Sequence, residues 1–127
     1  MSYMDIMKGM ALAGNSGGGG GGGTTLDYST TEQATGIKWI DGKEIYMISF
    51  DCHESPISTN NGTVADVTAL NIGDLISAEM TAASTTEKLT QGAAGRCVYI
   101  SGNTLKFYNG NAGGSLRYCT IWYTKAT

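Results

Sequence analysis

The chain has 127 residues, of which 41 % are apolar and 15 % are charged, and its formal net charge at pH 7 is −3. This length suits one domain with an appendage. The eight Lys and Arg residues are scattered, so the sequence lacks the basic surface that binds nucleic acid or an anionic membrane. No apolar stretch approaches the about 20 residues of a membrane-spanning helix. The low charged fraction, offset by Gly, Thr, Ser and Asn, is typical of a turn-rich all-β domain.

The three cysteines, Cys52, Cys97 and Cys119, are an odd number and show no CxxC or Cys/His zinc spacing. A free cysteine packs as a small apolar residue, so we expect three reduced thiols in a protein that assembles in a reducing cytosol. Asp5 interrupts the start of the chain, and no apolar core of a signal peptide follows it. The sequence therefore predicts no metal site and no passage through an oxidising compartment.

A run of seven glycines, Gly17–Gly23, divides the chain into two unequal parts. Glycine loses the most backbone entropy when it is ordered and has no side chain to build a core. The run is therefore interpreted as a flexible spacer. We expect an attachment segment over residues 1–16, a glycine-rich linker over 17–25 and a head domain over 26–127.

Residues 1–13 carry apolar side chains at three- and four-residue intervals, which predicts a short amphipathic helix. Gly14 and Asn15 are good stop signals for it. A helix of this length is marginal alone in water, and methionine adapts to irregular grooves, so we expect the segment to dock on a partner protein. The alternative is a start without regular structure. The predicted docking residues are Met4, Met7, Met10 and Leu12.

The head shows a series of short strand candidates separated by turn residues. Asp41-Gly42 and Ser101-Gly102-Asn103 have the composition of hairpin turns, because these residues accept positive φ. Strands at this spacing are typical of a β-sandwich or jelly-roll-like domain. The expected strands are residues 36–41, 44–52, 63–70, 75–83, 96–101, 104–108 and 116–125.

Several of these strands carry large aromatic residues on both faces. In the last strand, Tyr118 and Trp122 alternate with an apolar set that includes Tyr123. In the two preceding strands, Tyr99 and Tyr108 alternate in the same way with Ile100 and Phe107. A solvated strand face does not normally hold such side chains. Either neighbouring subunits cover them, which we favour, or they form an aromatic surface that binds a glycan. The candidate contact residues are Tyr99, Tyr108, Tyr118 and Trp122.

The sequence offers no catalytic constellation. His53 is the only histidine and directly follows Cys52, and adjacent strand residues point to opposite faces, so a Cys/His nucleophile pair is not expected. The acids of the head are dispersed, whereas a glycosidase needs two carboxylates about 5–10 Å apart. No Gly-Lys-Ser/Thr follows the glycine run, which excludes a phosphate-binding loop there. We expect no enzymatic activity, no catalytic residue, no cofactor and no bound metal.

Residues 28–46 read YSTTEQATGIKWIDGKEIY. This stretch resembles a module of small structural proteins of tailed bacteriophages, in which a YST-E-Q, G-WIDGK-IY pattern opens a β-sandwich head. Residues 105–108 (LKFY) and 120–125 (TIWYTK) resemble the closing strands of that family, although relatives often have a polar residue where this chain has Trp122. The Met-rich start and the glycine run resemble the attachment segment of phage head-fibre and tail-fibre proteins. Residues 55–94 match no known pattern.

The resemblance implies a non-enzymatic virion protein that is commonly a trimer, is assembled in the host cytoplasm and has no catalytic residues to transfer. It predicts a head fibre or capsid decoration subunit whose N-terminal segment docks on the capsid or another virion protein. The alternative is a tail-tip receptor-binding protein with a carbohydrate-binding head, in which an exposed aromatic ring stacks on a host surface sugar. A third class, a polysaccharide depolymerase, would need two close carboxylates in a groove.

Overall fold

The computed structural model describes residues 26–83, 88–89, 96–109 and 114–127. The predicted attachment segment with Met4, Met7, Met10 and Leu12, the predicted helix and the linker over 17–25 all lie outside these residues. Over the described part the chain is built from strands in two antiparallel sheets, with one short 3-10 helix, η1 (Thr68–Leu70). The prediction of an all-β protein is confirmed. No helix in the described part is long and apolar enough to cross a membrane.

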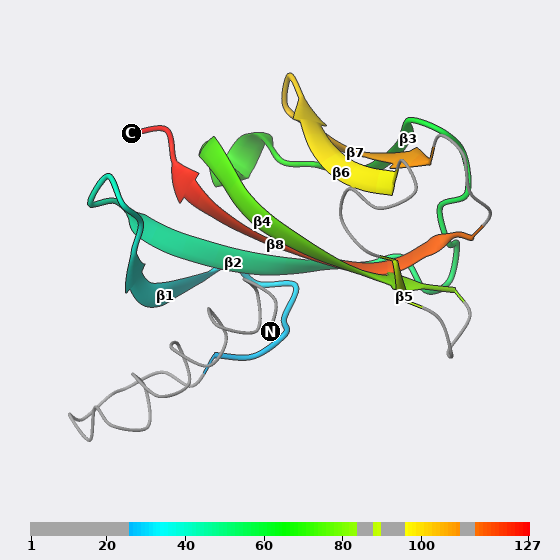
Figure 1. The fold of residues 1–127 in the computed structure, drawn as a ribbon, viewed down its shortest axis with the longest axis horizontal. Coiled ribbons are helices and arrows are strands. Elements are labelled where there is room, and N and C mark those ends of the chain that lie inside the picture. The colour runs from blue at the N-terminus through cyan, green and yellow to red at the C-terminus, as the bar shows by residue number, and fades with distance from the viewer. Residues whose placement is uncertain (1–25, 84–87, 90–95, 110–113) are drawn as a thin grey trace.

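The larger sheet has five strands in the order β1-β2-β8-β4-β5, and the smaller sheet has three in the order β3-β7-β6 (Figure 1). The larger sheet consists of β1 (Gln33–Lys38), β2 (Glu44–Asp51), β8 (Leu116–Lys125), β4 (Ile72–Ala82) and β5 (Lys88–Leu89). The smaller sheet consists of β3 (Gly62–Asp66), β7 (Thr104–Asn109) and β6 (Arg96–Ser101). The central strand β8 pairs with β2 on one side and β4 on the other, so elements far apart in the sequence meet in this sheet.

Two tight turns form where the sequence predicts them. Gly42, between β1 and β2, has φ +88°, and the Asp41 carboxylate accepts a hydrogen bond from the Lys43 backbone N–H at 2.9 Å. Gly102, between β6 and β7, has φ +61°. Both conformations cost glycine little and other residues more, so these glycines fix the register of the strands they join.

Residues from both sheets share one hydrophobic core. Figure 1 shows the smaller sheet beside the larger one. Leu105 and Phe107 of β7 and Leu116 and Ile121 of β8 are completely buried in it. Strands of both sheets thus contribute side chains to one apolar interior. The remaining buried members of this core are Ile48, Val67, Ala78, Met80, Ala82, Leu89, Val98, Cys119 and Tyr123.

A second, smaller apolar cluster lies on the other face of the larger sheet, which we call the outer face. Ile45 and Met47 of β2 pack there with Trp122 of β8, and Leu26 lies against them. Only 2 % of Trp122 is exposed. The chain itself therefore covers Trp122, and this residue is not available for the subunit or glycan contact that the sequence suggested.

The first and last parts of the head meet in a polar cluster beside the main core. The Lys125 ammonium donates to Glu32 Oε2 at 2.6 Å and to the Leu70 carbonyl at 2.9 Å, and it lies 4.8 Å from the centre of the Tyr46 ring. The Tyr123 hydroxyl donates to the same Glu32 oxygen. Glu32 and Lys125 are both about three-quarters buried, so each charge depends on the other for its neutralisation.

All three cysteines lie in the described residues, and none of them is in a disulfide. Cys119 is buried, whereas Cys52 and Cys97 are half-buried. Burial raises the pKa of the Cys119 thiol far above its ordinary value, so this sulfur stays protonated at neutral pH. Cys119 therefore acts as a small apolar core residue.

Candidate functional site

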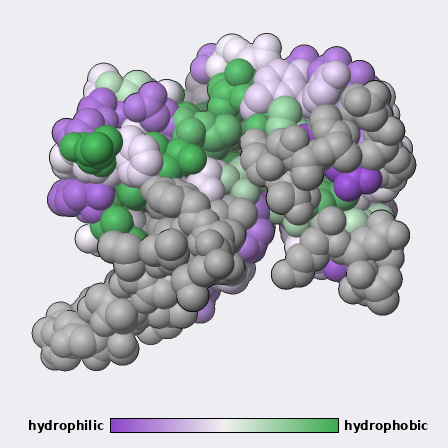
Figure 2. Space-filling view, in the orientation of Figure 1, coloured by the Kyte–Doolittle hydropathy of each residue, from purple (hydrophilic) through white to green (hydrophobic). Residues whose placement is uncertain are grey.

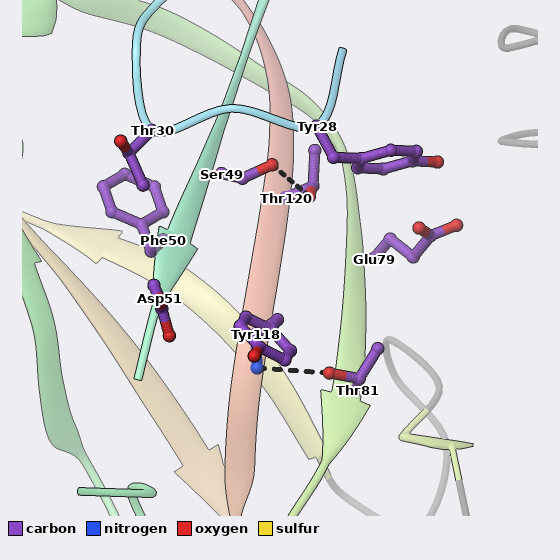
Figure 3. Close-up of a pocket in the computed structure, with 9 residues that line it drawn as sticks. All are labelled: Tyr28, Thr30, Ser49, Phe50, Asp51, Glu79, Thr81, Tyr118 and Thr120. Carbon is purple, nitrogen blue, oxygen red and sulfur yellow. Dashed lines mark hydrogen bonds between the residues drawn. The ribbon is translucent and has the colours of Figure 1, made fainter. Parts of the chain in front are cut away.

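A pocket of about 420 Å³ opens on the outer face of the larger sheet (Figure 3). Its floor comes from β2, β8 and β4, whose outward side chains alternate with those of the main core. Phe50, which also packs against that core, borders the pocket. A segment that precedes β1 forms its rim. The lining residues are Tyr28, Thr30, Ser49, Phe50, Asp51, Glu79, Thr81, Tyr118 and Thr120.

Residues 26–31, which we call the N-terminal strap, cross the outer face, with Leu26 against the Trp122 cluster and with Tyr28 and Thr30 lining the pocket (Figure 3). The Ser49 backbone N–H donates to the Ser29 carbonyl at 2.8 Å. The Gln33 side chain holds the strap at Asp27 through two hydrogen bonds. Its amide group donates to the Asp27 carbonyl at 2.7 Å, and its oxygen accepts from the Asp27 N–H at 3.1 Å. Figure 3 shows Thr30 beside β2 and Tyr28 on the side of Glu79.

Cross-strand pairing sets the floor of the pocket. Ser49 of β2 is opposite Thr120 of β8, which in turn is opposite Glu79 of β4. The Ser49 and Thr120 hydroxyls are 2.7 Å apart and share a hydrogen bond. In the next outward row, Tyr118 stands between Asp51 and Thr81 and its backbone N–H donates to the Thr81 hydroxyl at 3.2 Å. The pocket thus combines hydroxyls and carboxylates with the aromatic rings of Phe50 and Tyr118 on the strands and of Tyr28 on the strap.

Charged side chains gather at the Tyr118 end of the pocket. The Arg117 guanidinium lies 5.1 Å from the centre of the Tyr118 ring, and the His53 ring stacks beside that ring with centroids 6.0 Å apart. Asp51 Oδ1 accepts hydrogen bonds from the His53 backbone N–H at 3.0 Å and from His53 Nδ1 at 2.5 Å. Asp51 also lines a second hollow of about 480 Å³, formed with residues 52–55, Ile57, Thr63 and Val64.

The Asp51 carboxylate and the His53 ring stabilise each other's charge. The hydrogen bond to Asp51 and then its negative charge raise the pKa of His53, and the hydrogen bonds from His53 lower the pKa of Asp51. Both groups are exposed, so salt weakens their attraction. This end of the pocket therefore gains positive charge as the pH falls.

Because the chain has a single histidine, its titration can be followed directly by NMR. We predict that the pKa of His53 lies above its ordinary value of 6.5 and that Asp51→Asn returns it toward that value, since the charged partner is lost. High salt should lower the pKa in the original chain and have less effect in the variant. Equal His53 pKa values in the two proteins would contradict the pairing.

The arrangement of Asp51, Cys52 and His53 does not make an activated nucleophile. The Asp51 carboxylate accepts a hydrogen bond from the backbone N–H of His53, two residues further on, as well as the contact with its ring. This is the geometry of a local Asx turn. Burial and the Asp51 charge raise the pKa of Cys52, so its thiol is protonated at neutral pH. Within the described residues, no three His, Cys, Asp or Glu side chains are grouped to hold a metal ion.

The structure does not bring the four predicted contact residues together. Tyr118 lies in the pocket and is 38 % exposed, whereas Trp122 does not line the pocket and is buried in the cluster with Ile45 and Met47. Tyr108 on β7 is 39 % exposed, and the half-buried Tyr99 on β6 donates its hydroxyl to Asn61 Oδ1 at 2.6 Å. On the face shown in Figure 2, polar side chains separate the apolar patches.

Sequence reasoning missed most of the residues that line the pocket. Ser49 and Asp51 are polar and alternate along β2 with the buried Ile48. Successive side chains of a strand point to opposite faces, so this alternation could have predicted a row of polar side chains on the outer face. No local pattern placed Tyr28 or Glu79 beside them. Comparisons of the chain with protein-family models, with curated proteins and with solved structures find no match.

Proposed function

We propose that this chain is a non-enzymatic structural subunit of a bacteriophage virion, a head fibre or capsid decoration protein. Residues 1–16 dock on the capsid or another virion protein, residues 17–25 act as the spacer, and the head is displayed outward. Three copies form the functional unit, so that weak contacts of single heads add up to a useful avidity.

The observation that carries the proposal is the structural role of the residues in the phage-like stretches. Ser29 and Gln33 of the first stretch fasten the N-terminal strap, and Glu32 lies between them in sequence. Glu32 in turn bonds Tyr123 and Lys125, which belong to the closing stretch. Stretches from opposite ends of the chain therefore form one framework, as expected of a pattern that specifies a fold.

The finer description of the head as a β-sandwich or jelly-roll-like domain is part of this proposal. It is supported by two antiparallel sheets that share one core and by the non-local pairing of β8 with β2 and β4. Pairing of distant strands is characteristic of the Greek-key connections of such domains.

Removing residues 1–16 tests the attachment role. We predict that the shortened chain folds, because every buried core residue of the described head lies beyond residue 26, and that it is absent from purified virions. The measurement is an immunoblot of particles assembled with the shortened or the full-length chain. A full-length Tyr108→Ala variant is the matched control and should be incorporated normally. Normal incorporation of the shortened chain would refute the docking role.

A second candidate function is supported by the pocket itself. The exposed Tyr118 ring lies on a rigid floor among hydroxyl and carboxylate groups, which is the combination that a carbohydrate-binding head needs. In this reading the chain is a receptor-binding protein at the tail tip.

A further inference from the structure

We propose that Asn61 is a site of spontaneous covalent modification, namely deamidation, and that the turn before Gly62 and the Tyr99 hydroxyl hold this reaction back in the folded chain. The reaction needs water and no other reagent. Its products carry an aspartate or an isoaspartate at position 61. It is independent of the proposed virion function, so either can fail alone.

The chemistry follows from the pair Asn61-Gly62. Glycine has no side chain to obstruct its own backbone nitrogen, so this nitrogen can attack Cγ of the asparagine before it. A bond forms between the Gly62 nitrogen and Cγ, and the bond from Cγ to Nδ2 breaks. Nδ2 leaves as ammonia and takes the proton of the Gly62 N–H with it. The cyclic imide that remains takes up one water molecule and opens at either carbonyl, to aspartate or to isoaspartate.

The glycine that makes Asn61 reactive is required by the packing of the chain. A Cβ at position 62 would lie 2.6 Å from Ile57 Cγ2 and 3.0 Å from the Thr59 carbonyl oxygen. The first contact is too short to exist without a shift of the neighbour, and the second is with backbone. Gly62 also opens β3, where it is opposite Phe107 of β7. A larger residue therefore cannot remove the reactive pair without disturbing this part of the fold.

The turn that contains Asn61 keeps the reacting atoms apart. The Gly62 N–H donates to the Thr59 carbonyl at 3.0 Å, so Asn61 is the third residue of a four-residue turn, and its φ is +60°. Residues of such turns with positive φ have ψ of about 0–60°. These values place the Gly62 nitrogen and Asn61 Cβ on opposite sides of the Cα–C bond, whereas the imide ring needs them on the same side. Thr59 also holds the proton that must leave the nitrogen before it attacks.

Tyr99 holds the side chain of Asn61 from another strand. Its hydroxyl donates to Asn61 Oδ1 at 2.6 Å. Tyr99 lies on β6, Asn61 directly precedes β3, and β7 lies between these two strands in the smaller sheet (Figure 1). The bond thus reaches across a strand and fastens the turn to β6. A donor at Oδ1 makes Cγ more reactive only when the nitrogen can reach Cγ, so in this turn the bond retards the reaction by keeping the turn closed.

The two products have different effects on the fold. An aspartate at position 61 keeps the backbone, and its carboxylate can still accept the Tyr99 hydrogen bond. An isoaspartate adds a carbon atom to the backbone just before β3, which displaces Gly62 from its place opposite Phe107. Each conversion also replaces a neutral amide by a carboxylate. Deamidated chains are therefore more acidic than the original chain, and both products are one dalton heavier.

The test is incubation of the purified full-length chain at pH 8, folded or in urea, followed by peptide mapping with mass spectrometry. Mapping is needed because Asn109-Gly110 is a second pair of this kind. We expect Asn61 to convert at least about tenfold more slowly in the folded chain, since the turn must open before the reaction. No conversion in urea would refute the site, and equal rates in the two states would refute the protection.

Asn71 is the internal control. It is exposed and has φ +51°, as Asn61 has a positive φ, but the branched Ile72 follows it and obstructs the backbone nitrogen. We expect Asn71 to keep its amide both in the folded chain and in urea over the same period. Conversion of Asn71 at the rate of Asn61 would show that the following glycine does not determine the site.

Two matched variants test the role of Tyr99. Tyr99→Phe removes only the hydroxyl and should speed the conversion of Asn61 in the folded chain by about threefold or more, because a hydrogen bond that closes the turn is lost. Its rate in urea should not change. Tyr108→Phe, which removes an exposed hydroxyl from the neighbouring strand, should leave both rates unchanged. A Tyr99→Phe chain in which Asn61 converts no faster, or in which Asn109 speeds up by the same factor, would overturn the assignment to Tyr99.

Discussion

Replacing Trp122 by alanine is expected to lower the free energy of unfolding by about 3–5 kcal/mol, the usual cost of truncating a large buried aromatic side chain. Trp122 is 98 % buried on the outer face, where Ile45 and Met47 of the same sheet and Leu26 of the strap pack around it. Truncation leaves a cavity that these neighbours fill only in part. Denaturation by urea, followed by circular dichroism, measures the change.

Tyr118→Ala is the matched control for this substitution, because Tyr118 points to the same face of β8 and is 38 % exposed. It should lower the free energy of unfolding by less than Trp122→Ala does, because Tyr118 already exposes more of its side chain to solvent. A large effect of Trp122→Ala is expected at every protein concentration, because the cover of Trp122 comes from its own chain. A Trp122→Ala change below about 1 kcal/mol would contradict the packing.

The different environments of Tyr118 and Trp122 show how far the sequence predicts this fold. The two residues are four positions apart in one strand and point to the same face. Alternation therefore correctly places them on the face opposite to the buried Cys119 and Ile121. It does not show that Leu26, together with Ile37, Trp39 and Ile76, packs against the cluster of Trp122, whereas Tyr118 stays exposed. These contacts come from three separate parts of the chain, so the pattern within β8 does not contain them.

The same limit applies to individual strands and to the pocket. Residues 68–70 were expected to continue a strand but form η1, because the Asp66 carboxylate accepts bonds from the Thr68 N–H and hydroxyl at 2.9 and 2.6 Å and turns the chain. The two-residue β5 is too short for any period to indicate it. Asp51 of β2 and Glu79 of β4 line the same pocket because both strands pair with β8 in a particular register. That register is set by tertiary pairing and not by either strand alone.

Glu32→Gln is the second substitution with a large expected effect, because it removes the charge that neutralises Lys125. The ammonium of Lys125 would remain about three-quarters buried, with the Leu70 carbonyl and the Tyr46 ring as its other contacts. Leaving a partly buried charged group without its charged partner costs about 1–3 kcal/mol in the free energy of unfolding. Lys125→Met, which removes the ammonium and keeps an apolar chain, should restore part of this loss in the double variant. Strict additivity of the two single changes would show that the side chains do not interact.

The Tyr123 hydroxyl gives the same cluster a dependence on pH. Burial, and then its bond to the Glu32 carboxylate, raise the pKa of Tyr123 above its ordinary value of 10.0. A raised pKa in the folded state means that the folded chain holds this proton more tightly than the unfolded chain does. The stabilising contribution is therefore complete below pH 10 and decreases as the pH rises above it, where the unfolded chain ionises first. Urea denaturation at pH 8 and pH 11 measures how much the free energy of unfolding falls between the two pH values. We expect a smaller fall in Tyr123→Phe than in the original chain. An equal fall in both proteins would exclude Tyr123 as its source.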